Sequence, residues 1–297
     1  MLFFSLVHYG LATTAPAPRT LIYGPGDQTL RLCTAKIAAR QGIESALYAG
    51  EDGGFQQAWR SLMYGKAYAD GGVDAPGNAR VLSAVEELGE TLAKVQALVL
   101  VCDKPLPAGT AKTLFSNSGD ELKRVVMVSK MGATRAKPPG PFGIGGEDAA
   151  VLASEKELRE LSAAKGCDLS IVRVGTLKGG GPGDEELTTP ETEAGLSVSY
   201  YNTLIKLEEY MCTSAYDKFT LGAKVTSGDT IELANPIMRA ARASDFSPFD
   251  DETSRVVAAG AVVQALKHPS AVDISVSAAK GEQAPTPEEW ATIFDGL

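Results

Sequence analysis

The stretch RTLIYGPGDQTLRLCTAKIAARQGIESALYA, residues 19–49, decides the fold. Its first five residues are apolar and β-rich, and they run into Gly24-Pro25-Gly26, which is a turn signal. Apolar residues then recur at helical spacing from Gln28 to Gln41, and Gly42 ends the pattern. A second strand candidate, Glu44–Ala49, follows. Strand, glycine turn, helix and strand within about thirty residues are typical of a βαβ unit.

The rest of the chain continues this alternation. Unbroken apolar runs at 97–102, 124–129 and 169–173 predict strands covered on both faces. A helix from Asp148 to Lys165, ended by Gly166, separates the last two. We therefore predict an α/β fold with a doubly wound, mostly parallel Rossmann-type sheet. The pattern also predicts helices near 55–63, 81–95, 200–213, 250–266 and 286–297, and strands near 66–69 and 272–277.

We expect one domain over residues 19–297, in which residues 178–250 form a small substrate-capping part. No linker is long enough to separate a second domain. Residues 1–18 form an N-terminal extension or a targeting remnant. Their apolar start is too short to span a bilayer and lacks a positively charged region. The expected location is the cytoplasm or an organelle stroma, the chloroplast included, with no membrane span.

Composition narrows the classes of partner. The 297 residues carry a net charge of −9, which repels nucleic-acid backbones and anionic lipid. The four cysteines are scattered and there are two histidines, so we expect neither a metal site nor a disulfide framework. The expected partners are a dinucleotide and a small molecule, and a protein partner or a homodimer is left open.

The glycine turn lies where a phosphate-binding loop belongs. Such a loop needs a tight turn, a close backbone approach to pyrophosphate and a helix N-terminus facing the anion. Gly24 and Gly26 fit the first two positions of G-x-G-x-x-G, and Thr29 stands at the third. We predict that these residues, with Asp27 and Gln28, bind the cofactor. The alternative is a plain strand-to-helix turn with Asp27 as the N-cap, since its carboxylate would repel pyrophosphate.

A second group of predicted cofactor contacts follows the next strands. Glu51 lies about twenty residues beyond the glycine turn, the usual place of the acid that binds the adenosine ribose. An acid there favours NAD over NADP because it repels a 2′-phosphate. The alternative is a solvated loop acid. Cys102 and Asp103, at the end of the strand at 97–102, complete this group. The predicted cofactor is NAD or NADP, with NAD favoured.

Several stretches together resemble one known family. They are RTLIYGPGDQTLR, VVMVSKMGA, KELRELSAAKGCDLSIVRVGTLKGG, ETSRVVAAGAVVQAL and PEEWATIF. In this combination the chain resembles the atypical short-chain dehydrogenase/reductases, which have one Rossmann domain and a small C-terminal substrate region. The likeness spans roughly residues 19–297 and is loose over 50–95 and 185–250.

The resemblance implies a catalytic pair and one departure. The family's serine corresponds to Ser129 and its lysine to Lys156, which would also bind the nicotinamide ribose. The tyrosine position is then Leu152, which has no hydroxyl to supply a proton. Lys156 is alternatively a surface lysine. A tyrosine from the capping part, Tyr200 or Tyr201, is a candidate stand-in.

Two arginines remain to be assigned. Arg173, at the carboxyl end of its strand, is a predicted cofactor contact or else the partner of a nearby carboxylate. Arg255 is equally explained by a salt bridge near a helix cap. Two functions therefore stay open: a cofactor-binding protein that is non-catalytic or uses non-standard chemistry, and an NAD(P)H-dependent oxidoreductase for a small or medium apolar substrate.

Overall fold

The computed structural model describes a part of the chain that includes every element named below. This part comprises residues 19–50, 59, 63–64, 79–135, 146–180, 195–196, 219–230 and 248–297. The extension at 1–18, Glu51, the expected strand at 66–69 and the expected helix at 200–213 lie outside it. Most of the expected helix at 55–63 and of the capping part at 178–250 also lies outside.

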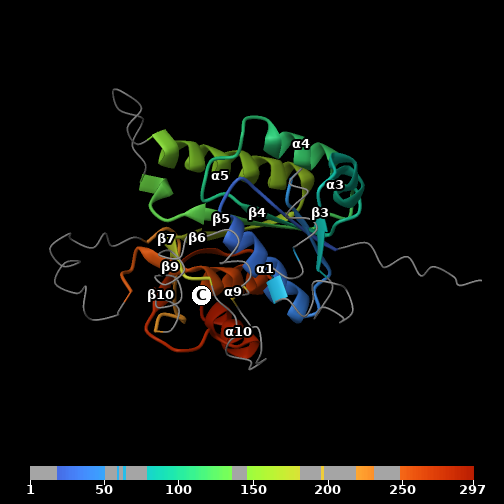
Figure 1. Ribbon diagram of the computed structural model, residues 1–297. Coiled ribbons are helices and arrows are strands. Elements are labelled where there is room, and N and C mark those ends of the chain that lie inside the picture. Colours follow the sequence, from blue (N-terminus) through green and yellow to red (C-terminus); the bar gives the residue numbers. More distant parts are fainter. Residues whose placement is uncertain are drawn as a thin grey trace, which may run out of the picture.

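A mostly parallel sheet forms the centre of the described part (Figure 1). Its strand order is β3-β2-β1-β4-β5-β6-β10-β8. The strands are β1 (Thr20–Tyr23), β2 (Ser45–Tyr48), β3 (Ala79–Leu82), β4 (Ala97–Val101), β5 (Arg124–Lys130), β6 (Asp168–Val174), β8 (Gly222–Ser227) and β10 (Asp273–Ala279). All neighbours are parallel except β8, which is antiparallel to β10. The order reverses direction between β1 and β4, and ligands bind at such a switch point in doubly wound sheets.

Helices cover both faces of the sheet (Figure 1). One face carries α1 (Gln28–Arg40), α9 (Arg255–Lys267) and α10 (Pro287–Asp295). The other carries α3 (Val85–Leu92), α4 (Thr110–Asn117) and α5 (Gly146–Lys165). The predicted doubly wound α/β fold is therefore confirmed.

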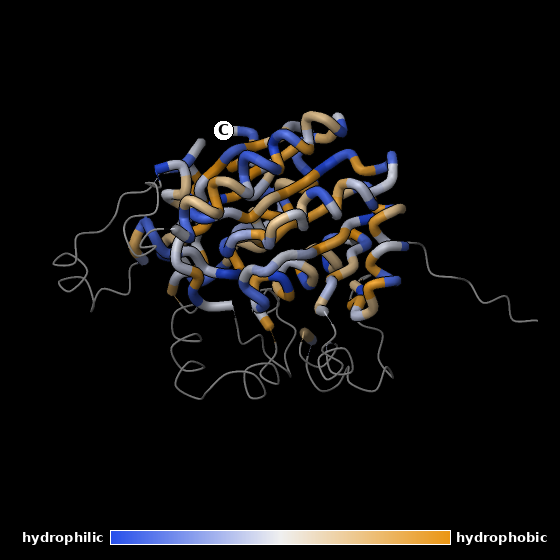
Figure 2. Tube along the Cα trace, turned by 90° about the horizontal axis from the view of Figure 1, so that it is seen from above, coloured by the Kyte–Doolittle hydropathy of each residue, from blue (hydrophilic) through white to orange (hydrophobic). Residues whose placement is uncertain are grey.

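Two apolar layers hold the helices to the sheet. Hydrophobic and hydrophilic residues alternate along the segments of the described part (Figure 2). Because successive strand residues point to opposite faces, Val126 and Val128 pack toward α9, whereas Val125 and Met127 pack toward α5. Helix α9 is buried along nearly its whole length, which explains its apolar sequence.

Most expected elements appear within a few residues of their predicted bounds. The strands expected at 97–102 and 124–129 are neighbours, with Leu98 opposite Val125. The helix expected at 81–95 is shorter, because its first residues belong to β3, which pairs with β2. The helix expected from 250 begins at Arg255, after the short strand β9 (Glu252–Ser254).

Part of the predicted capping region contributes to sheets instead. Residues 222–227 form β8, the edge strand beside β10. Residues 176–178 form β7 (Thr176–Lys178), which pairs with β9 in a separate two-stranded parallel sheet. This small sheet brings the segment after β6 beside the start of α9.

Candidate functional site

The glycine turn is packed tightly against the end of β4. Gly26 donates its N–H to the carbonyl of Val101 at 3.0 Å. Gly24 has a φ of +138°, and a methyl group on it would overlap the Val101 backbone. A methyl on Gly26 would overlap the Asp103 carboxylate. The two glycines are therefore required by a close approach within the chain itself.

Asp27 caps the helix that starts at this turn. Its Oδ1 accepts the N–H of Leu30 at 2.7 Å, so Asp27 is the N-cap of α1. The N–H of Asp27 donates to Oδ1 of Asp103 at 2.9 Å. Gln28 is exposed at the first position of α1, and Thr29 is buried. In a phosphate-binding turn, backbone N–H groups at this position face the bound anion. Here the carboxylates of Asp27 and Asp103 accept these N–H groups instead.

Arg255 neutralises the Asp27 carboxylate. Its Nε lies 3.0 Å from both Asp27 oxygens, and its Nη2 lies 2.8 Å from Oδ2. Its Nη1 donates to the carbonyl of Gly179 at 2.8 Å. The salt bridge near a helix cap that the sequence suggested for Arg255 is therefore present, and it joins the glycine turn to residues 179–180.

The end of β4 adds a second carboxylate and an inert thiol. Burial raises the pKa of the Asp103 carboxyl, and the charge of Asp27 adds to the increase, although the bond from the Asp27 N–H opposes it. Burial also raises the pKa of the Cys102 thiol, and the charge of Asp103 raises it further. Cys102 is fully buried, so it forms part of the core.

The carboxyl end of β2 carries a cation that the sequence analysis missed. Arg31, one turn into α1, donates Nη1 to the carbonyl of Tyr48 at 3.3 Å. Tyr48 stacks on Tyr23, with ring centroids 5.6 Å apart. Helical spacing from the glycine turn places Arg31 here, although no arginine directly follows β2 in the sequence. Glu51 lies outside the described residues.

Ser129 faces a carboxylate. Its hydroxyl donates to Oε1 of Glu155 at 2.6 Å, and both side chains are buried. Glu155 also receives two bonds from Arg173, Nε–Oε1 at 3.0 Å and Nη2–Oε2 at 2.7 Å. Arg173 forms a further ion pair with Asp273, so the carboxylate-partner alternative for Arg173 is confirmed. Burial alone would lower the pKa of Arg173, but its bonds to Glu155 and Asp273 raise it.

Lys156, the other half of the predicted pair, is exposed. It follows Glu155 in α5, where one residue corresponds to a turn of about 100° around the helix axis. The structure therefore places Glu155, and not Lys156, against Ser129. Four residues earlier on the buried side stands Val151, and Leu152 beside it is half-buried. Neither residue carries a hydroxyl.

The structure thus forms two polar clusters. Gly24, Gly26, Asp27, Thr29 and Asp103 gather with Arg255 at the β1–α1 turn. Ser129 and Arg173 gather with Glu155 and Asp273 under α5. The first cluster lies at the carboxyl ends of β1 and β4, and the second lies between β5, β6 and α5.

A further cluster fixes the turn after β5. Asp229 accepts the N–H of Gly132 at 2.7 Å and the hydroxyl of Thr134 at 2.6 Å. Burial alone would raise the pKa of Asp229, but these bonds, with the N–H of Thr134, lower it. Asp229 therefore ties the loop after β8 to the turn after β5.

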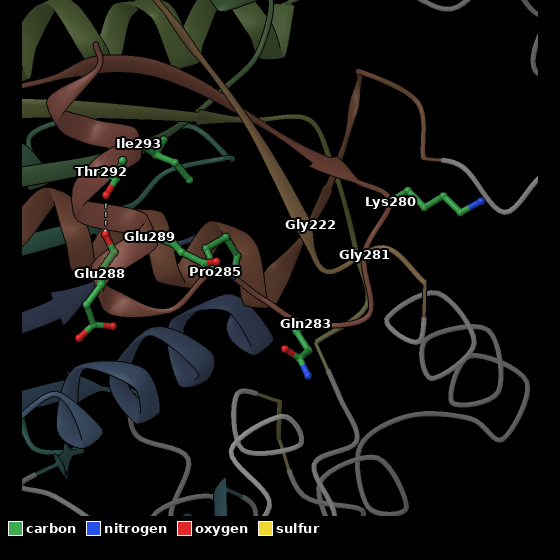
Figure 3. A pocket seen from close by; sticks show the side chains of 9 residues that line it. All are labelled: Gly222, Lys280, Gly281, Gln283, Pro285, Glu288, Glu289, Thr292 and Ile293. Carbon is green, nitrogen blue, oxygen red and sulfur yellow. Dashed lines mark hydrogen bonds between the residues drawn. The ribbon is translucent and has the colours of Figure 1, made fainter.

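A cavity of about 550 Å³ lies at the carboxyl end of β10 (Figure 3). Its lining comes from the start of β8, the loop after β10 and one side of α10, and Lys280 extends away from the rest of it (Figure 3). Neither polar cluster contributes a residue to this lining.

Two features are absent from the described residues. Their helices include none with the length and hydrophobicity of a membrane span. Within the same residues, no group of three histidine, cysteine or acidic side chains is arranged to hold a metal ion.

Comparison with known proteins supports the fold alone. No protein-family model matches the sequence, and no curated protein matches it. Among solved structures, a variant of SsCR is 10% identical, with 94% of this chain and 83% of that chain covered and a TM-score of 0.51. Gre2 from Candida albicans is 10% identical, with 94% and 82% covered and a TM-score of 0.49. The UDP-N-acetylglucosamine 4-epimerase from Bacillus cereus is 14% identical, with 93% and 84% covered and a TM-score of 0.42. The likeness to the SsCR variant, which has the highest TM-score of these three, concerns the α/β fold alone.

Proposed function

We propose that this chain is a dinucleotide-binding Rossmann-fold protein that does not reduce carbonyls by the tyrosine-dependent mechanism. The observation that carries the proposal is the bond from the buried Ser129 hydroxyl to Glu155, which Arg173 holds in turn. This arrangement supports a binding role, in which the fold senses or presents a ligand without turning it over.

The chemistry of the cluster explains why. A carbonyl reductase needs a group that gives up a proton as hydride arrives. An ionised carboxylate only accepts hydrogen bonds, and an arginine does not deprotonate in proteins. Ser129 therefore has its proton directed at Glu155. The ion pair stabilises this geometry and supplies no general acid.

Dinucleotide binding is supported by the strand order and by the side chains at the carboxyl ends of β1 and β2. Tyr23 and Tyr48 offer apolar ring surface there, and Arg31 offers a positive charge. Glu51 favours NAD, whereas Arg31 favours a 2′-phosphate and hence NADP. NAD(H) remains the first ligand to test.

The test combines binding and turnover. We expect calorimetry with NAD(H) and NADP(H) to show binding, and a panel of simple ketones and aldehydes to show no reduction above the buffer rate. Arg31→Glu should weaken NADP(H) more than NAD(H), because it replaces attraction to a 2′-phosphate by repulsion. Reduction of a ketone that is lost in Ser129→Ala would contradict the proposal, as would the absence of binding at millimolar dinucleotide.

The second candidate is an NAD(P)H-dependent oxidoreductase for a small or medium apolar substrate. The strand order favours it, because the switch point between β1 and β4 is where such enzymes hold their cofactor. It requires a proton donor other than Ser129. Turnover that persists in Ser129→Ala and is lost when Tyr200 or Tyr201 becomes phenylalanine would support this candidate.

A further inference from the structure

Arg255 occupies a position that its own helix disfavours. It is the first residue of α9, where the helix dipole repels a positive charge. Its guanidinium instead binds both carboxylate oxygens of Asp27. Both side chains are about four-fifths buried, at 20% and 19% exposure, so solvent screens this pair only partly.

The same arginine holds a second segment against α1. Its Nη1 binds the carbonyl of Gly179, and its side chain packs beside Gly180. Gly180 has a φ of +110°, and a methyl group on it would lie 2.9 Å from the Thr29 methyl carbon. The carbonyl of Gly180 accepts the thiol of Cys33 at 3.7 Å.

One turn further along α1 the contact continues. Lys36, which is buried, donates to the carbonyl of Gly195. Leu196 donates its N–H to the carbonyl of Gly180 at 3.0 Å. Residues 179–180 and 195–196 therefore lie together over α1 between Thr29 and Lys36, and Arg255 joins them to the glycine turn.

A pyrophosphate at this turn would meet these contacts. The N–H groups of Leu30 and Asp27 are bound by carboxylates, and Asp27 and Asp103 would repel an anion. We propose that the Asp27–Arg255 ion pair is a latch, which closes residues 179–180 over α1 and competes with the phosphates of the ligand. The competition rests on the proposed dinucleotide binding.

Cys33 reports the state of the latch. It is fully buried and lies against Gly180, so iodoacetamide reaches it only when the segment opens. Cys167, which is bound to the Ser162 carbonyl, serves as the internal control. The rates are read by mass spectrometry of the separate cysteine peptides in the full-length protein.

Three variants open the latch in different ways. Asp27→Asn removes the charge but keeps a good N-cap, Arg255→Gln removes the cation, and Gly180→Ala pushes against Thr29 without changing charge. Each should speed Cys33 labelling by about tenfold or more, while the rate at Cys167 stays unchanged. Arg159→Gln, which breaks an exposed ion pair between α5 and Asp273 of β10, is the matched control and should label at the wild-type rate.

The affinity for dinucleotide distinguishes the effect of the Asp27 charge from that of the Arg255 charge. Asp27→Asn should bind dinucleotide about tenfold more tightly than the wild type, and Arg255→Gln should not, because it also loses the cation that would face the phosphates. Unchanged Cys33 labelling in all three variants would overturn the latch. Faster labelling with no gain in affinity for Asp27→Asn would overturn the competition. Faster labelling without dinucleotide binding by any variant would support the latch and contradict the proposed function.

Discussion

Glu155 and Arg173 are an ion pair in the interior, at 2% and 1% exposure. Removing charges from water costs several kcal/mol per ion, and good geometry with additional hydrogen bonds is needed to offset that cost. Here the bidentate contact, the Ser129 hydroxyl and Asp273 supply those bonds. The pair therefore fixes the distance between α5 and β6.

Removing one partner should destabilise the fold strongly. We expect Glu155→Ala to lower the free energy of unfolding by about 3–5 kcal/mol, because Arg173 keeps its charge and loses two bonds. Glu155→Gln should cost less, since it retains an acceptor for Ser129. Urea denaturation followed by circular dichroism measures both. Lys224→Gln, which breaks an exposed pair with Asp250 outside this network, should change the value by less than about 1 kcal/mol. Equal effects for Glu155→Ala and Lys224→Gln would show that the buried network is not structural.

Asp103 gives a pH-dependent prediction. Because burial raises its pKa above the unfolded value of 3.8, the folded protein binds its proton more tightly than the unfolded chain does. Stability from this group therefore falls as pH rises from the unfolded pKa through the folded one. Asp103→Asn removes this titration and keeps an oxygen for the Asp27 N–H. The variant should have a higher Tm than the wild type at neutral pH, and the difference should vanish in acid. A Tm gain that is constant with pH would contradict this assignment.

At the scale of elements, two helical glycines differ in what surrounds them. Gly260 in α9 faces α10, and a methyl group on it would lie 2.6 Å from Nε1 of Trp290. Gly89 in α3 is exposed, with nothing within 4 Å. Helix propensity alone predicts that alanine stabilises both helices.

Packing should reverse that expectation at one of the two sites. We expect Gly89→Ala to stabilise the protein by up to about 1 kcal/mol. Gly260→Ala should destabilise it by about 1–3 kcal/mol, because α10 must move away from α9. Thermal melts of the two variants test this directly. Stabilisation of both would mean that α10 packs loosely on α9.

The sequence predicted the buried strands well. It did not predict strand β8 or which charged residue of α5 faces the core. The apolar runs in β4, β5 and β6 identify strands covered on both faces, because little else produces such runs. Strand β8 (GAKVTS) has no fully buried residue and pairs with β10, which is distant in sequence, so no local signal marks it. In α5 the run Glu155-Lys156-Glu157 has a charge at every position. Its pattern therefore could not show which charge points inward, and the family resemblance favoured Lys156.

The site was predictable only in outline. The glycine turn and the acid beside it follow from spacing. The partner of Asp27 is Arg255, and the partner of Ser129 is Glu155. Both pairs join residues that are distant in sequence, so the folded chain decides which side chains meet. A pattern of residue types carries no such pairing information.

At the scale of the whole molecule, the last strand and helix complete both the sheet and one apolar layer. Strand β10 pairs with β6 and β8, and Trp290 and Phe294 of α10 join the layer beneath α9. We expect a chain that stops at Pro269 to be recovered in the insoluble fraction, because it exposes this layer. Deletion of residues 1–18 should leave the Tm within about 2 °C, since we predict that they lie outside the domain. Solubility assays and thermal melts decide both. A soluble, cooperatively folded chain ending at Pro269 would be contrary to this view of the core.

The position of β10 between β6 and β8 also sets the timing of folding during translation. The ribosome releases β6, which ends at Val174, well before β10, which begins at Asp273. At typical elongation speeds of about 5–20 residues per second, the nascent sheet waits several seconds with the amides of β6 open to other polypeptides. A chaperone that covers extended strands on the emerging chain would therefore act on this protein in that interval, and its depletion should lower the yield of folded protein without changing the stability of the molecules that do fold.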